Sequence, residues 1–258
     1  MKKAFSTLCC LDLSLEQIKE LASLTHMDAV ELRVDHGSIE ALDRAAKELG
    51  NSKLTVCDVA SSIFIRGSEL DSQCDAYLRL ARQLSAPAVR VFAAADYEGV
   101  LDVNAIAEGL ARLCDMAKIL GLEIWLENHS EFSTVKECRS LCDMASRDNL
   151  RILWDVMHSL EYGESLTESL SHLVGKLAHV HLKDGYPEKG KREYTLCALG
   201  EGSFTIEDVV DLLEENRYDG YLSLEWESPW CPHLRGLYEN NEELLDRYND
   251  ILKKAGIK

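Results

Sequence analysis

Four polar residues in this chain each stand at the end of a separate apolar run. They are Glu127 in LEIWLEN, Asp155 in LRILWD, His181 in LAHVHL and Glu225 in YLSLEWE. Three carboxylates and one imidazole are ligands that suit a hard divalent cation. Metal binding by all four requires a fold that brings the ends of four separate segments together.

The order of elements along the chain predicts such a fold. Apolar runs alternate with amphipathic stretches, which predicts strand followed by helix throughout. The predicted strands cover residues 4–11, 29–35, 53–61, 88–95, 122–128, 150–156, 176–184 and 221–227. Two predicted helices start at residues 14 and 134. Six others cover residues 38–49, 68–84, 103–120, 165–174, 205–216 and 239–254. This alternation predicts a single (β/α)8 TIM barrel over residues 1–258, with a doubly wound open sheet as the alternative.

Local signals mark some of the boundaries. Ser14 with Gln17, and Thr134 with Glu137, have capping-box spacing at helix starts. The charged, turn-rich stretch over 184–202 has no clear periodicity, so we expect a loop over the strand ends.

Strand alternation predicts that the four polar residues converge. Side chains along a barrel strand point in turn to the axis and to the helices. If Glu127 faces the axis, Trp125 does too, while Ile124 and Leu126 face the helices. The same count holds on the other three strands, and catalytic residues of such barrels lie at the carboxyl ends of the strands.

Each of the four residues has an ordinary structural alternative. A single strand-end acid is commonly a helix cap or a surface charge, and a single histidine is commonly a hydrogen-bonded structural group. Several carboxylates inside one barrel mouth, however, need a compensating charge, which a divalent cation supplies. The joint pattern therefore predicts a metal site.

Composition limits the other classes of function. The formal net charge of −17 opposes binding to nucleic acid, because that affinity comes mainly from Lys and Arg. No apolar run is long enough to span a bilayer, and we expect no membrane partner. The nine cysteines are scattered without a CxxC pair, which favours reduced thiols and a cytoplasmic protein.

Short motifs across nearly the whole chain resemble the xylose isomerase-like TIM-barrel superfamily. This group includes ketose 3-epimerases, hydroxypyruvate isomerase, inosose dehydratase and abasic-site endonuclease. The motifs are ELR at 31–33, ENH at 127–129, WDVMH at 154–158, HVHLKD at 179–184, LGEG at 199–202 and LEWE at 224–227. One departure is Ala198, which takes the place of a proline that usually precedes LGEG.

The resemblance implies one divalent metal ion, with manganese, magnesium, cobalt and zinc all known in the family. It implies ligation by Glu127, Asp155, His181 and Glu225, and contact between His158 and a substrate oxygen. It also implies a substrate-binding arginine just after the strand-seven histidine, for which Arg192 is our candidate, with Lys191 as the alternative position. Dimers are common in the family, so a homodimer is a further expectation.

The first hypothesis for the reaction is isomerisation or epimerisation of a small sugar or polyhydroxy keto compound. The metal would bind the carbonyl oxygen and stabilise the enediolate that forms when the adjacent C–H proton leaves. Glu127 and Glu225 would approach opposite faces of that carbon, one removing the proton and the other returning one.

Three other functions are alternatives to this hypothesis. A dehydratase of the inosose or dehydroshikimate type begins with the same proton abstraction and then expels a hydroxyl. An abasic-site endonuclease would need further histidine ligands and a basic surface. A non-catalytic sugar-binding barrel would have no need of both glutamates.

Several nearby residues have two readings. Glu31 and Arg33 either contact the far hydroxyls of the substrate or form an ion pair inside the barrel. Glu201 either contacts the substrate or fixes the far end of the loop over 184–202, while Lys183 and Asp184 would fix its start. We expect His179 to be structural and His129 either to belong to the ENH motif of the site or to cap the next helix.

Overall fold

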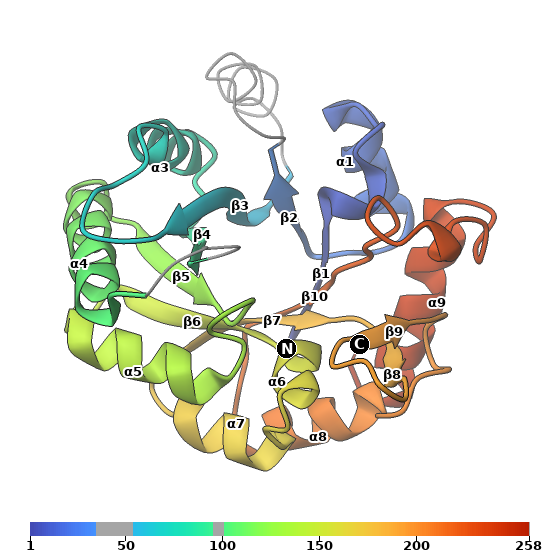
Figure 1. Ribbon diagram of the computed structural model, residues 1–258. Coiled ribbons are helices and arrows are strands. Elements are labelled where there is room, and N and C mark those ends of the chain that lie inside the picture. Colours follow the sequence, from blue (N-terminus) through green and yellow to red (C-terminus); the bar gives the residue numbers. More distant parts are fainter. Residues whose placement is uncertain (35–53, 95–100, 258) are drawn as a thin grey trace.

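Eight parallel strands close into a barrel in the computed structural model of the chain (Figure 1). The structure describes residues 1–34, 54–94 and 101–257. Around the barrel the strands are β1 (Lys2–Ser6), β10 (Tyr221–Leu224), β7 (Leu177–Leu182), β6 (Leu150–Asp155), β5 (Glu123–Glu127), β4 (Ala88–Ala93), β3 (Val56–Ile65) and β2 (Ala29–Arg33). The predicted TIM barrel is therefore confirmed, and the open sheet is wrong.

Helices follow the strands and surround the barrel (Figure 1). They are α1 (Leu15–Leu24), α3 (Cys74–Gln83), α4 (Val103–Ile119), α5 (Val135–Ala145), α6 (Val156–Glu161), α7 (Leu166–Leu173), α8 (Ile206–Glu215) and α9 (Asn241–Lys254), with short 3-10 turns η1 (Thr7–Cys10) and η2 (Pro232–Leu234). Both predicted capping boxes are present, at Ser14 and Thr134. The predicted helix over 38–49 lies outside the described residues, as do positions 35, 53 and 95 of three predicted strands.

The predicted alternation of side chains along the barrel strands is confirmed on β5. Ile124 and Leu126 are fully buried in the main hydrophobic core. Trp125 faces the other way and stacks inside the barrel on His179, with ring centroids 5.4 Å apart. Because the outward faces bury their apolar side chains against helices, the inward positions are free to carry polar residues.

The stretch over 184–202 is more ordered than expected, so the prediction of a plain loop was wrong for part of it. Strands β8 (Gly185–Pro187) and β9 (Tyr194–Leu196) form an antiparallel hairpin. Strands of three residues are too short to show periodicity in the sequence. The Asp184 carboxylate accepts hydrogen bonds from the backbone N–H groups of Gly185 (2.9 Å) and Gly200 (2.6 Å), which joins the two ends of the hairpin and confirms Asp184 as a loop anchor.

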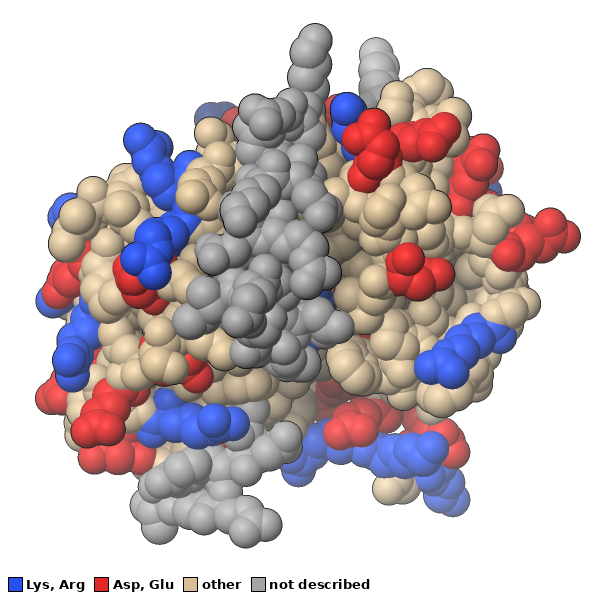
Figure 2. Space-filling view, turned by 90° about the horizontal axis from the view of Figure 1, so that it is seen from above, with Lys and Arg blue, Asp and Glu red and all other residues tan. Residues whose placement is uncertain are grey.

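The nine cysteines are free thiols, and all but Cys231 are buried. Within the described part of the chain, we find no helix both long and apolar enough to cross a bilayer. Acidic and basic side chains are interspersed on the face of the molecule that Figure 2 shows.

Candidate metal centre

The four predicted ligands come together at the carboxyl ends of their strands. Glu127, Asp155, His181 and Glu225 each offer one ligand atom, and these atoms all lie within 4.8 Å of one another. Glu127 and Asp155 are the last residues of β5 and β6, His181 is near the end of β7, and Glu225 follows β10. All four side chains are buried.

The His181 imidazole shows that this cluster suits a cation. Its Nδ1 lies 3.7 Å from Oε1 of Glu127 and 3.6 Å from Oε2 of Glu225, and among the described residues it has no hydrogen-bond partner. Its Nε2 contacts Glu31. Burial lowers the pKa of His181, but the charges of Glu31, Glu225 and Glu127 outweigh burial and raise this pKa well above its ordinary value. A divalent cation between Nδ1 and the carboxylates would satisfy both the free nitrogen and the excess negative charge.

Lys183 lies inside the site, although we expected it only to fix the loop after β7. Its Nζ is 2.8 Å from Oδ2 of Asp155 and 2.9 Å from Oε2 of Glu225, and it also contacts Glu227. Burial lowers the pKa of Lys183, but the three carboxylates raise it well above its ordinary value. Its position could have been inferred from the alternation that places residues 179, 181 and 183 on one face of the strand.

Arg90 is a second cation of the site that the sequence analysis missed. This β4 residue is fully buried, and its Nε lies 3.1 Å from Oε2 of Glu127. Burial raises the pKa of Glu127, but Arg90 and then His181 outweigh burial and lower it to about 2. A charged residue inside the apolar run AVRVFA was the available signal, because such a residue is rarely buried without a partner.

Two histidines line a cavity of about 260 Å³ beside the four candidate ligands. His158 Nδ1 lies 2.9 Å from Oε2 of Glu161, and His158 Nε2 lies 3.5 Å from Nζ of Lys183. His129 does not cap the next helix, which Thr134 caps instead. Burial and the nearby His158 lower the pKa of His129 to about 4, so its imidazole is neutral at pH 7. Lys183 lines the same cavity and thereby connects it to the metal ligands.

The other predicted substrate contacts differ in how deeply they are buried. Glu31 lies behind His181 and contacts its ring, and the described ion pairs of Glu31 are with His179 and His181 rather than with Arg33. Arg33 is half-buried at the end of β2. Arg192 is exposed, with its guanidinium 4.8 Å from the ring centroid of Tyr162. Glu201 is exposed, and neither it nor Arg192 is among the residues that line the cavity.

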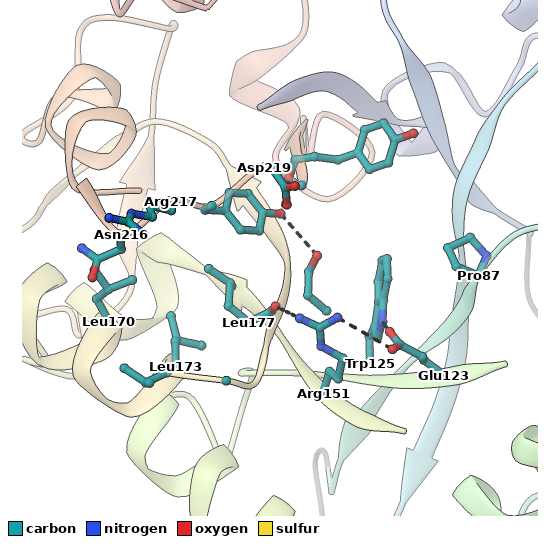
Figure 3. Close-up of a pocket in the computed structure, with 16 residues that line it drawn as sticks. Pro87, Glu123, Trp125, Arg151, Leu170, Leu173, Leu177, Asn216, Arg217 and Asp219 are labelled. Carbon is teal, nitrogen blue, oxygen red and sulfur yellow. Dashed lines mark hydrogen bonds and ion pairs between the residues drawn. The ribbon is translucent and has the colours of Figure 1, made fainter. Parts of the chain in front are cut away.

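A larger cavity, of about 620 Å³, opens at the opposite end of the barrel, and Figure 3 shows the residues that line it. It is lined by residues near the starts of strands, including Glu123, Trp125 and Arg151. Glu123 is already engaged there by the indole N–H of Trp125 (2.8 Å) and by Arg151 (3.7 Å). None of our predicted site residues lines this basal cavity, and catalytic sites of such barrels lie at the other end.

A family model described as xylose isomerase-like TIM barrel matches residues 18–254. The chain belongs to the xylose isomerase-like TIM-barrel family. Within this family, it is 31% identical over 137 residues to an inosose dehydratase from Clostridium perfringens, an alignment that covers 47% of this chain and 46% of that protein. The chain thus spans about half the length of the relatives it matches in sequence.

Solved structures agree with the xylose isomerase-like fold. An L-ribulose 3-epimerase superposes with a TM-score of 0.78 at 18% identity, covering 98% of this chain and 94% of the other. The IOLI protein with a bound zinc atom superposes with a TM-score of 0.76 at 18% identity, covering 99% and 98%. At this identity the likeness concerns the fold.

Proposed function

We propose that the protein is a divalent-metal-dependent isomerase or epimerase of a small sugar or polyhydroxy keto compound. The observation that carries the proposal is the placement of Glu127 and Glu225 at nearly equal distances from the free Nδ1 of His181. Glu127, Asp155, His181 and Glu225 would hold manganese, magnesium, cobalt or zinc. When bound, the cation supplies a Lewis acid that increases the acidity of the C–H group next to the substrate carbonyl.

The chain itself supplies the acid and base groups. One of Glu127 and Glu225 takes the proton from the carbon next to the carbonyl, and the other returns a proton to that carbon or its neighbour. Arg90 keeps Glu127 ionised, and Lys183 does the same for Glu225, whose pKa lies well below its ordinary value despite burial. His158 lines the cavity and would hold a substrate oxygen there.

A metal-dependent dehydratase is the second candidate, and two observations favour it. His129 lines the cavity as a neutral imidazole, which is the state that a general base requires. The charged amine of Lys183 lies in the same cavity, where it can donate a hydrogen bond to a departing hydroxyl. An inosose dehydratase is also among the relatives in sequence.

The proposed substrate is a small, sugar-like molecule. The cavity is small, and His129, His158 and Glu161 offer it the polar groups that bind hydroxyls. Nucleic acid and membranes are not proposed as partners, because the net charge of −17 repels anionic surfaces. A homodimer in the cytoplasm stays a proposal that gel filtration and fractionation would test.

Proton NMR in D₂O tests the proposal directly. The protein with Mn²⁺ would be incubated with a panel of ketoses, inososes and hydroxy-keto acids. Deuterium entering the carbon next to the carbonyl, with all hydroxyls retained, supports the isomerase or epimerase. Deuterium exchange or C–H loss accompanied by loss of a hydroxyl supports the dehydratase. No exchange and no reaction with any compound of the panel would overturn both.

A further inference from the structure

A second group of ligating side chains lies inside the barrel, apart from the four residues described above. Cys57 and Asp58 of β3 and His179 of β7 each offer one ligand atom, and these atoms all lie within 4.8 Å of one another. Asp58 and His179 are completely buried, and Cys57 is 1% exposed. In the barrel, β3 and β7 are not neighbours, so the three residues meet across its interior.

A β-bulge explains how two consecutive residues face the same site. Consecutive side chains of a regular strand point to opposite faces. The pairing of β2 with β3 shifts at this point, because Val30 pairs with Val56 whereas Glu31 pairs with Asp58. Cys57 is the extra residue, and it packs with the small side chains of the barrel interior while Asp58 stays beside Glu31. Bulges of this kind re-aim side chains and are frequent near functional sites.

Polar atoms of this group lack partners. Among the described residues, neither ring nitrogen of His179 makes a hydrogen bond, and the same holds for Oδ2 of Asp58. His179 is nevertheless held firmly, because its ring stacks on Trp125 with an interplanar angle of 19°. Buried polar groups normally make hydrogen bonds, so a fixed imidazole and a carboxylate oxygen that make none point to a ligand at this position.

The charge of the interior also points to a cation. Asp58 of β3 pairs with Glu31 of β2, and both side chains are completely buried. Glu31 lies between the two groups, with Oε2 in contact with His181 and 3.5 Å from Nε2 of His179. Two buried carboxylates so close together are costly unless a positive charge lies between them or a proton neutralises one.

We propose that Cys57, Asp58 and His179 bind a second divalent cation of the zinc or cobalt class. A thiolate, an imidazole and a carboxylate together favour such borderline-soft ions over magnesium or calcium. Sγ of Cys57 lies 3.5 Å from Oδ1 of Asp58. That separation fits two ligands on one tetrahedral ion, with metal–sulfur and metal–oxygen distances of about 2.3 and 2.1 Å.

The proposed role of this ion is structural. It would join β3 to β7 across the barrel and would compensate the charge beneath the first metal centre. Trp125 and Tyr221 flank the His179 ring, and both also line the basal cavity. The second site therefore lies on the side of the barrel away from the substrate cavity.

Cobalt loading of the full chain tests the proposal without an activity assay. The protein would be stripped with chelator and reloaded with Co²⁺, and its metal content and absorption spectrum would then be measured. We expect two cobalt ions per chain and a thiolate-to-cobalt charge-transfer band, because the first centre contains no cysteine. Cys57→Ala should remove the band and one ion, whereas Glu225→Ala should weaken the first centre and leave the band.

Matched variants keep the test decisive. Cys231→Ala replaces the one thiol that is not buried, and it should keep both ions and the band. Near-ultraviolet circular dichroism would confirm that each variant is folded. If Cys57→Ala does not fold, Asp58→Asn serves as a second variant, and we expect it to weaken the thiolate-to-cobalt band. A single cobalt ion without a thiolate band in the folded wild type would overturn the proposal, as would a band that survives Cys57→Ala.

Discussion

Nε of Arg90 lies 3.1 Å from Oε2 of Glu127, and each side chain is only 1% exposed. Arg90→Met would leave a buried carboxylate without its cation. We expect the free energy of unfolding of the metal-free protein to fall by about 3–5 kcal/mol, as measured by urea denaturation. Arg79→Met, which removes an exposed pair with Asp75, is the control and should cost about 0.3–0.5 kcal/mol. Equal effects of the two substitutions would contradict the assigned role of Arg90.

Lys183 should compete with the metal ion for the carboxylates of the site, and it should stabilise the metal-free protein. In Lys183→Met, the carboxylates of Asp155, Glu225 and Glu227 lose a common cation. We therefore expect metal-free stability to fall by about 3–5 kcal/mol. Added Mn²⁺ should recover more stability in this variant than in the wild type, because the competing charge is gone. Lys191→Met on the surface of the hairpin is the control, and an equal response of both variants to Mn²⁺ would refute the interpretation.

Metal removal should lower the melting temperature. An ion present at 100 times its dissociation constant contributes about 2.7 kcal/mol to stability, and chelation removes this contribution. His181→Ala should weaken the response to chelator, because the free Nδ1 is lost. Calorimetry with and without chelator, together with elemental analysis, measures both effects. A wild-type protein without bound divalent metal and without a chelator response would exclude the metal centre.

Substitution of Glu127 and Glu225 tests their proposed roles as acid and base. Glu127→Gln and Glu225→Gln should each slow C–H exchange by about 10²–10⁴-fold, the usual range for a general acid or base. Glu123→Gln changes the same strand as Glu127 at its opposite end, beside the basal cavity, and should leave exchange unchanged. Retained exchange in either of the first two variants would remove that residue from the mechanism.

Glu161 should attach the hairpin to the barrel in a pH-dependent way. Its carboxylate accepts a hydrogen bond from the backbone N–H of Tyr194 (2.7 Å) and lies 2.9 Å from Nδ1 of His158. Burial raises the pKa of Glu161, but the hydrogen bond with His158 outweighs burial and lowers it below 4.5. A lowered carboxylate pKa stabilises the fold above the unfolded value, and this contribution is lost as the pH falls through the folded value.

Glu161→Gln should therefore cost about 1.5–3 kcal/mol at pH 7, the range for a hydrogen bond to a charged group. The difference from the wild type should shrink as the pH falls below 4.5, the unfolded value. Thermal melts across this pH range measure the difference. Glu188→Gln, on the exposed side of the same hairpin, is the control. A difference that stays constant with pH would show that the Glu161 charge plays no part.

The sequence by itself determined the barrel and the four residues of the candidate metal centre. Periodicity distinguishes strand from helix, and alternation places Glu127, Asp155, His181 and Glu225 on inward faces, so these predictions depend only on nearby residues. The caps at Ser14 and Thr134 were predictable for the same reason, because a capping box joins residues only three positions apart in the chain.

Only the tertiary structure decided which residues from distant strands meet. Arg90 reaches Glu127 on the neighbouring strand, and Glu31 contacts His181 rather than pairing with Arg33. The bulge at Cys57 is a property of how β2 and β3 pair, and no pattern within one strand shows it. Such contacts depend on strand register and barrel closure, which a local pattern leaves free. The chemistry of the ligands was therefore readable from the chain, whereas the charges that surround them were fixed by the closed barrel.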